Sequence, residues 1–229
     1  MNDVDWETLY TRYAQARGFD DAAAIYEILE HAHTILSDSS LQELDWFKAA
    51  LQDQERKWFV ALALRKNSTM PELLFTPMIE AGVAQADPQN HIYFIEPVMR
   101  SFGPRRVNLS LLYILEDGSD AEKSGAVQCL YCSLRLVGHR GIANDAIYDI
   151  QERCRRVMLR TFVSNENVHL RRCILTQLNF DEERYPEELR PLLPEAIRIA
   201  RTHPDTYIRH RIRVQLGEIS EYMSLPSRE

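Results

Sequence analysis

Residues 192–217 read LLPEAIRIARTHPDTYIRHRIRVQLG, and this segment has the pattern of two helices joined by a short turn. Apolar residues recur at helical spacing before Pro204, which ends the first helix. Asp205 can cap the second helix, on which Ile208 and Ile212 begin an apolar stripe. Because neither helix can bury its stripe alone, the segment predicts a helical hairpin that packs against neighbouring hairpins.

An earlier segment repeats this pattern. Asn167-x-x-Leu170-Arg171 aligns with Asp205-x-x-Ile208-Arg209 at a spacing of 38 residues. The order Leu-Leu-Pro, Pro-Asp-x-x-Ile-Arg and Leu-Gly resembles a HEAT repeat, and the resemblance covers residues 41–219, most closely in the last two units. It implies an all-α, right-handed α-solenoid of about five to six helical hairpins.

Upstream periodicity predicts further hairpins, with helices over 4–17 and 20–36, 41–52 and 53–66, 71–86 and 89–102, 104–116 and 119–137, and 142–163 and 167–179. Residues 1–40 lack the repeat pattern, and a solenoid needs an atypical unit to cover its end. We therefore expect an N-terminal helical cap over 1–40 and one continuous repeat array over 41–229. Asp120 is the expected cap of the helix over 119–137.

Composition supports an all-α chain and gives a soft constraint on its partners. Glycine is sparse, and no segment shows the sustained alternation of a strand. The net charge of −7 disfavours a nucleic-acid partner. This charge is uneven, because residues 1–134 carry a balance of −9 and residues 135–229 a balance of +2. An acidic half would speed association with a basic protein.

The sequence has no recognisable catalytic or metal-binding constellation. Cys129-x-x-Cys132 has no further ligand pair at matching spacing, and GxSxG, P-loop and GxGxxG motifs are absent. We expect the cysteines to be buried, reduced thiols and the scattered histidines to be solvated or to cap helices. The amino-terminal residues do not resemble a signal peptide, and no apolar run is long enough to span a membrane. A cytoplasmic protein without enzymatic activity, metal or cofactor is predicted.

The HEAT resemblance also points to binding residues, because such solenoids usually hold their ligand on the inner surface formed by the second helices. Two roles stay open for Arg171 and Arg209: pairing with Asp205 between repeats, or binding. The candidates for protein binding, taken from the repeat arginine position and its surroundings, are Arg56, Lys57, Tyr93, Arg171, Arg172, Arg209 and Arg213.

Three functions fit this pattern. The first is a non-catalytic protein-binding module that uses the concave face, either as an adaptor, a regulatory subunit or an inhibitor of the immunity-protein type. The alternative is a nucleic-acid-binding or DNA-repair protein of the HEAT-like kind, which requires a basic channel with aromatic side chains and a carboxylate. A cofactor- or chromophore-related lyase rests on fold analogy alone.

Overall fold

The computed structural model describes residues 5–36, 41–65, 69–140 and 147–219, and these segments are helical without any β-strand. The predicted break at 37–40 and the start of the helix predicted over 142–163 lie outside them. The helices are α1 (Trp6–Gly18), α2 (Ala22–Leu36), α3 (Leu41–Gln52), α4 (Arg56–Arg65), α5 (Phe75–Val83), α6 (His91–Phe102), α7 (Pro104–Asp117), α8 (Asp120–Arg140), α9 (Tyr148–Ser164), α10 (Val168–Leu175), α11 (Leu192–Thr202) and α12 (Thr206–Gln215).

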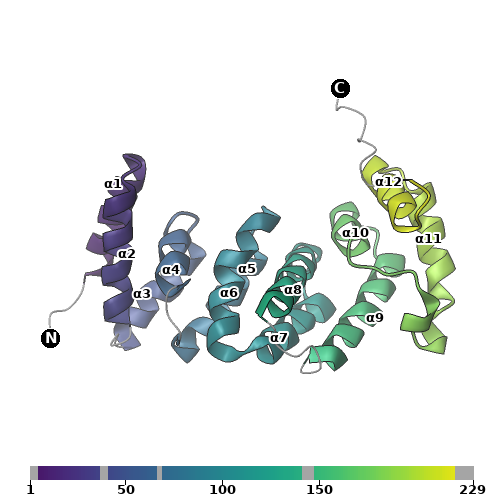
Figure 1. The fold of residues 1–229 in the computed structure, drawn as a ribbon, viewed down its shortest axis with the longest axis horizontal. Coiled ribbons are helices and arrows are strands. Elements are labelled where there is room, and N and C mark those ends of the chain that lie inside the picture. Colours follow the sequence, from purple (N-terminus) through teal and green to yellow (C-terminus); the bar gives the residue numbers. More distant parts are fainter. Residues whose placement is uncertain (1–4, 37–40, 66–68, 141–146, 220–229) are drawn as a thin grey trace.

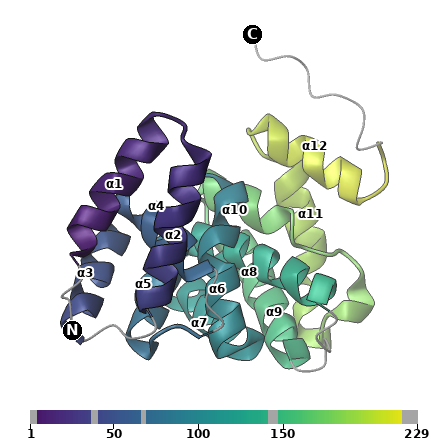
Figure 2. The same ribbon diagram turned by 60° about the vertical axis from the view of Figure 1, so that its left-hand side comes forward.

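Consecutive helices pack in pairs, from α1 with α2 to α11 with α12. The first helices of neighbouring pairs contact one another from α3 through α5, α7 and α9 to α11. The second helices form a parallel series of contacts from α2 through α4, α6, α8 and α10 to α12. Figures 1 and 2 show the pairs following one another along the long axis. This two-layered, all-α arrangement is compatible with a helical solenoid.

The turns before several second helices use the same cap. The side chain of Asp205 accepts a hydrogen bond from the Ile208 amide at 3.0 Å, as predicted. Asn167 does the same for Leu170 at 3.0 Å. An oxygen of Asp53 accepts from the Arg56 amide at 2.9 Å. Each bond satisfies an amide that has no partner within its own helix.

The predicted cap at Asp120 is wrong. Ser119 precedes α8, and its amide donates to a Glu122 carboxylate oxygen at 2.8 Å while its hydroxyl faces the Glu122 amide at 3.4 Å. This reciprocal arrangement is a capping box. The Asp120 side chain instead accepts a hydrogen bond from the Asn165 amide group at 2.7 Å, which ties α8 to the end of α9.

One core runs through the array, from Trp6 in α1 to Ile212 in α12. Adjacent aromatic residues divide between this core and its flanks. Phe47, Phe59 and Phe94 are wholly buried, whereas Trp46, Trp58 and Tyr93 are half-buried. Trp6 packs edge-on against Phe47 at a centroid distance of 4.5 Å. This contact fixes the first helix pair to the second.

One glycine is needed for close packing in the middle of the array. A Cβ atom on Gly125 of α8 would lie 2.0 Å from the backbone oxygen of Val83, at the end of α5. A backbone atom cannot move aside as a flexible side chain can, so a larger residue at this position would separate α8 from α5.

Among the described residues, no helix is both long and apolar enough to cross a membrane.

Candidate functional site

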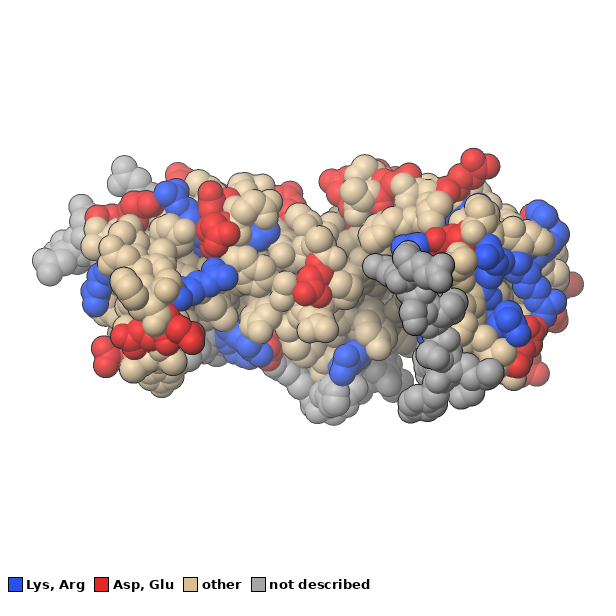
Figure 3. Space-filling view, turned by 90° about the horizontal axis from the view of Figure 1, so that it is seen from above, with Lys and Arg blue, Asp and Glu red and all other residues tan. Residues whose placement is uncertain are grey.

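A groove of about 1750 Å³ crosses the second helices of the last four pairs, and we call it the inner groove. Its lining comes mainly from α8, α10 and α12, with contributions from the start of α6 and the residues before it and from the end of α11. Seen from above, Lys and Arg side chains gather at the C-terminal end of the molecule, on the right of Figure 3. The groove is therefore a feature of the stacked second helices, where the HEAT resemblance led us to expect a binding surface.

The charge of the inner groove is opposite to that of the chain. Its lining includes the arginines Arg135, Arg172, Arg201, Arg209, Arg211 and Arg213. Glu218 is the single acidic residue among the described residues that line it. Since the whole chain carries −7, this local excess of positive charge creates a potential that attracts anionic groups.

Three of the predicted binding residues, Arg172, Arg209 and Arg213, line the inner groove. Arg172 forms a two-point ion pair with Asp205, and its Nε lies 3.2 Å from one carboxylate oxygen. This hydrogen-bonded pair holds the pKa of the Asp205 carboxyl below its ordinary value. The pair joins α10 to the cap of α12, so the pairing expected between repeats exists but uses Arg172 rather than Arg171.

Arg171 and Arg209 bind backbone carbonyl groups. The Arg171 side chain is buried, and its Nε donates to the carbonyl oxygen of Phe162 at 3.1 Å. Burial lowers its pKa, although a guanidinium stays charged at any ordinary pH. Arg209 donates to the carbonyl oxygens of His203 and of Pro204, the latter at 2.7 Å. Both arginines thus satisfy carbonyl groups near the end of the preceding helix.

The other predicted residues lie outside the lining of the inner groove. Arg56 pairs with Glu7 at 2.7 Å and lies over the ring of Tyr10, so it joins α4 to α1. Lys57 is buried, its Nζ donates to the Gln54 side chain at 2.7 Å, and burial lowers its pKa.

Tyr93 is likewise used in packing. Its ring meets Trp58 edge-on at a centroid distance of 5.9 Å. The guanidinium carbon of Arg65, on α4, lies 5.1 Å from the centre of the Tyr93 ring, on α6. A cation over the face of an aromatic ring is a stabilising arrangement, here between neighbouring helix pairs.

The part of the inner groove nearer the middle of the array is apolar. Half-buried Ile92 from α6 and Leu136 from α8 line it together with exposed Tyr131, whereas Val127 is wholly buried. Tyr131 is 48% exposed, and the guanidinium carbon of Arg135 lies 5.9 Å from its ring centre. The groove thus offers exposed apolar surface beside Arg135 at one end, and its other five arginines come from α10, α11 and α12.

Two thiols also line the inner groove, against the expectation that all four cysteines are buried. Cys132 and Cys173 are half-buried, whereas Cys129 and Cys154 are buried. Burial raises the pKa of Cys132 to about 11 and raises that of Cys173 as well. A thiol with a raised pKa is a weak nucleophile at neutral pH, because the thiolate is the reactive form.

The histidines were expected to be solvated or to cap helices, and His91 is not solvated because it is wholly buried. Its Nδ1 lies 2.9 Å from the carbonyl oxygen of Gly82, and its Nε2 lies 3.1 Å from the Gln128 side chain. Both ring nitrogens therefore have partners, as buried polar groups require. His91 links α6 to α5 and α8, and its role is structural.

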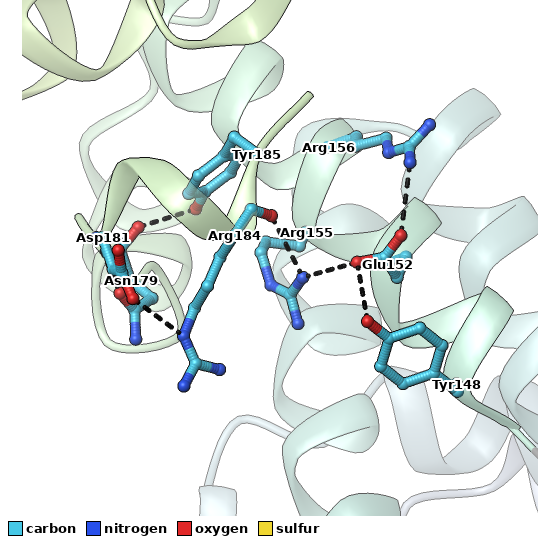
Figure 4. A network of polar contacts seen from close by, with 8 residues as sticks. All are labelled: Tyr148, Glu152, Arg155, Arg156, Asn179, Asp181, Arg184 and Tyr185. Atoms are coloured by element: carbon cyan, nitrogen blue, oxygen red, sulfur yellow. Dashed lines mark hydrogen bonds and ion pairs between the residues drawn. The ribbon is translucent and has the colours of Figure 1, made fainter. Parts of the chain in front are cut away.

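Arg155 and Arg156 of α9 belong to a different network (Figure 4). Glu152 binds Arg155 at 3.2 Å and Arg156 at 3.3 Å. Arg155 also donates to the carbonyl oxygen of Arg184 in the connection to α11, at 3.4 Å. Tyr185, which is 2% exposed, donates to the Asn179 carbonyl oxygen at 2.8 Å and secures the same connection. These contacts hold the connecting segment against α9.

Sequence reasoning missed several side chains of the inner groove: Tyr131, Arg135, Arg201, Tyr207 and Arg211. No group of three or more metal-ligating side chains is present among the described residues. Comparison with protein-family models, with curated proteins and with solved structures finds no match to this chain. The geometry of the inner groove is therefore the main basis for a functional proposal.

Proposed function

We propose that this chain is a HEAT-like, right-handed α-solenoid that binds another protein in its inner groove and performs no chemistry of its own. One observation carries the proposal: the second helices of four successive pairs form a groove that combines exposed apolar surface with six arginines. Surfaces that combine aromatic, apolar and arginine side chains are typical of protein interfaces. The four free cysteines suit a reducing compartment such as the cytoplasm.

The charge of the inner groove favours an acidic region of the partner. The net charge of the chain pointed instead to a basic partner. Net charge affects the rate at which two proteins approach from a distance, whereas the side chains of the groove determine which groups can bind in direct contact. An acidic segment would meet arginines on α10, α11 and α12. An adaptor, a regulatory subunit and an inhibitor could each use such a groove.

Nucleic-acid binding is the second candidate, and the arginines together with Tyr131 and Tyr207 favour it. Against it, Arg172 is paired with Asp205 and Arg213 faces Glu218, while Arg209 binds backbone carbonyl groups. Phosphate contacts would have to displace these partners. The apolar surface at Ile92 and Leu136 also suits a peptide side chain better than a phosphate backbone.

The experiment is a pull-down from the native cell lysate with the tagged full chain, with and without nuclease. A groove variant carries Arg135→Gln, Arg201→Gln and Arg213→Gln. A matched control carries three substitutions of arginines paired outside the groove, Arg105→Gln, Arg153→Gln and Arg198→Gln, whose partners are Asp149, Glu116 and Glu195. Both variants lose three positive charges.

We expect one protein to be retained by the wild type and by the control after nuclease treatment, and to be lost by the groove variant. Equal retention by the groove variant would refute the proposed function. Capture that disappears with nuclease in the wild type would favour the nucleic-acid alternative.

A further inference from the structure

The arginines of the inner groove already hold a carboxylate, and it comes from the turn after α12. Gly217 has φ +71°, a left-handed conformation that glycine adopts without strain. The Gly217 amide donates to the Val214 carbonyl at 3.0 Å and the Glu218 amide to the Arg213 carbonyl at 2.9 Å. These two bonds form a Schellman motif, which turns the chain back over the end of α12. The motif thereby fixes the backbone from which the Glu218 side chain projects.

Two guanidinium groups from different helices converge on this carboxylate. Arg201, near the end of α11, pairs with one oxygen of Glu218. The Nε of Arg213, in the last turn of α12, lies 3.8 Å from the other oxygen. A carboxylate between two guanidinium groups on separate helices has the arrangement of a bound acidic side chain.

These ion pairs are exposed enough to exchange. The exposed fraction of the side chain is 52% for Arg201, 55% for Arg213 and 36% for Glu218. Ion pairs at such exposure contribute little net stability, because water solvates the separated charges well. A carboxylate from another molecule can therefore replace Glu218 at small cost.

The rest of the inner groove indicates what accompanies that carboxylate. Apolar side chains from α6 and α8 that keep exposed surface, Ile92, Tyr131 and Leu136, line the end away from α12. A ligand that contacts both ends needs acidic groups and apolar groups on one short segment. A phosphate chain offers charge without the apolar groups, and a basic peptide would be repelled by the arginines.

We propose that the inner groove binds an acidic, amphipathic segment of the partner protein and that one carboxylate of this segment displaces Glu218 from Arg201 and Arg213. Glu218 is then an internal competitor that occupies the anion site in the free protein. This inference rests on the proposed function, since it names the chemistry of the partner at the same groove.

The test begins with a selection from a library of random peptides displayed on phage, using the purified full chain. We expect enriched peptides to combine Asp or Glu with Leu, Ile or Phe, and to be lost on the groove variant. Enrichment of basic or uncharged peptides, or no groove-dependent enrichment, would overturn the inference. The best peptide is then synthesised with a fluorescent label, and its affinity is measured by anisotropy.

The decisive variant is Glu218→Gln, and its matched control is Glu195→Gln. Glu195 pairs with Arg198 on α11 outside the inner groove, at 2.6 Å and with 39% of its side chain exposed. Both substitutions remove one negative charge. We expect Glu218→Gln to tighten peptide binding about three- to tenfold, while Glu195→Gln changes it less than about twofold. An equal effect of the two substitutions would refute the competitor role.

A second comparison links the effect to the two arginines. Arg213→Gln should weaken binding of the peptide about tenfold, whereas Arg198→Gln should leave it within about twofold. In a chain that carries Arg201→Gln and Arg213→Gln, the further change Glu218→Gln should no longer tighten binding. If it still did, Glu218 would act through the overall charge of the groove and not as a competitor at this site.

The failures of the two proposals are distinguishable. If the protein captured from lysate is retained by the groove variant, the proposed function fails. If capture depends on the groove but Glu218→Gln behaves as Glu195→Gln does, the groove still binds protein and only the displacement of Glu218 is refuted.

Discussion

The two ends of the array use their cations differently. At the N-terminal end, Arg56 lies between Glu7 and the Tyr10 ring, and Lys57 is buried. At the C-terminal end, Arg172 and Arg213 are about half exposed and line the inner groove. The basic side chains therefore pack against neighbouring helices in one region and line an open groove in the other. The side chains that the neighbouring helix pair supplies decide which role a cation has.

The largest effect that this comparison predicts is on the N-terminal core. Phe59 is wholly buried, and its ring contacts Tyr10, Tyr13 and Trp46. We expect Phe59→Ala to lower the free energy of unfolding by about 3–5 kcal/mol, because the substitution removes buried apolar surface and leaves a cavity. Urea denaturation followed by circular dichroism measures the change.

The matched control is Tyr131→Ala, at an exposed aromatic of the inner groove. It should lower the free energy of unfolding by less than about 1 kcal/mol, because exposed side chains contribute little to the core. Equal losses for the two substitutions would contradict the division between a packed N-terminal region and an open groove.

The next largest predicted effect is a difference in stability between variants of two adjacent arginines, Arg171 and Arg172. Arg171→Gln should lower the free energy of unfolding by about 1–3 kcal/mol, because it leaves the buried carbonyl of Phe162 without its hydrogen-bond donor. Arg172→Gln should lower the free energy of unfolding by less than about 1 kcal/mol, because the ion pair of Arg172 with Asp205 is partly exposed. Thermal unfolding of both variants checks the order, and the reverse order would show that the Arg172 pair is the structural one.

These neighbouring arginines show what the sequence could and could not predict. The helical periodicity and the Asp205 and Asn167 caps were sufficient to predict the helices and turns of the last two pairs. The repeat pattern also predicted an ion pair between these units. It could not identify Arg172 as the partner of Asp205, because a shift of one residue on a helix changes the direction of a side chain by about 100°.

The inner groove was harder to predict, because its lining comes from helices far apart in the chain. Tyr131 and Arg135 are one turn apart on α8, and that spacing shows only that they share a helix face. Which face is exposed depends on how α6, α8 and α10 pack. The buried His91 was missed for a similar reason, since its partners Gly82 and Gln128 lie on other helices.

The smallest predicted effect is on how the free energy of unfolding depends on pH. The pKa of Asp205 is lowered by its hydrogen bond with Arg172, so the stability that this carboxylate contributes is present above its ordinary pKa and is lost as the pH falls through the lowered value. Asp205→Asn keeps a capping oxygen but removes the charge. We expect it to lower the free energy of unfolding by about 1 kcal/mol or less at neutral pH, and the difference from wild type should disappear as the pH falls through the lowered pKa of Asp205.

Urea denaturation of both proteins across pH 2–7 measures this difference. Asp53→Asn is a suitable comparison, because Asp53 is fully exposed and its lowered pKa arises mainly from backbone hydrogen bonds with no matching arginine pair. A difference between Asp205→Asn and wild type that does not change with pH would exclude the ion pair as its cause.

The central claim is that the C-terminal arginines bind a partner whereas the N-terminal cations hold the fold. The most direct measurement is the affinity of the selected fluorescent peptide for Arg213→Gln and Arg56→Gln, measured side by side by anisotropy. The account predicts binding about tenfold weaker than wild type for Arg213→Gln and unchanged within about twofold for Arg56→Gln. Equal losses for the two variants, or a loss confined to Arg56→Gln, would contradict it.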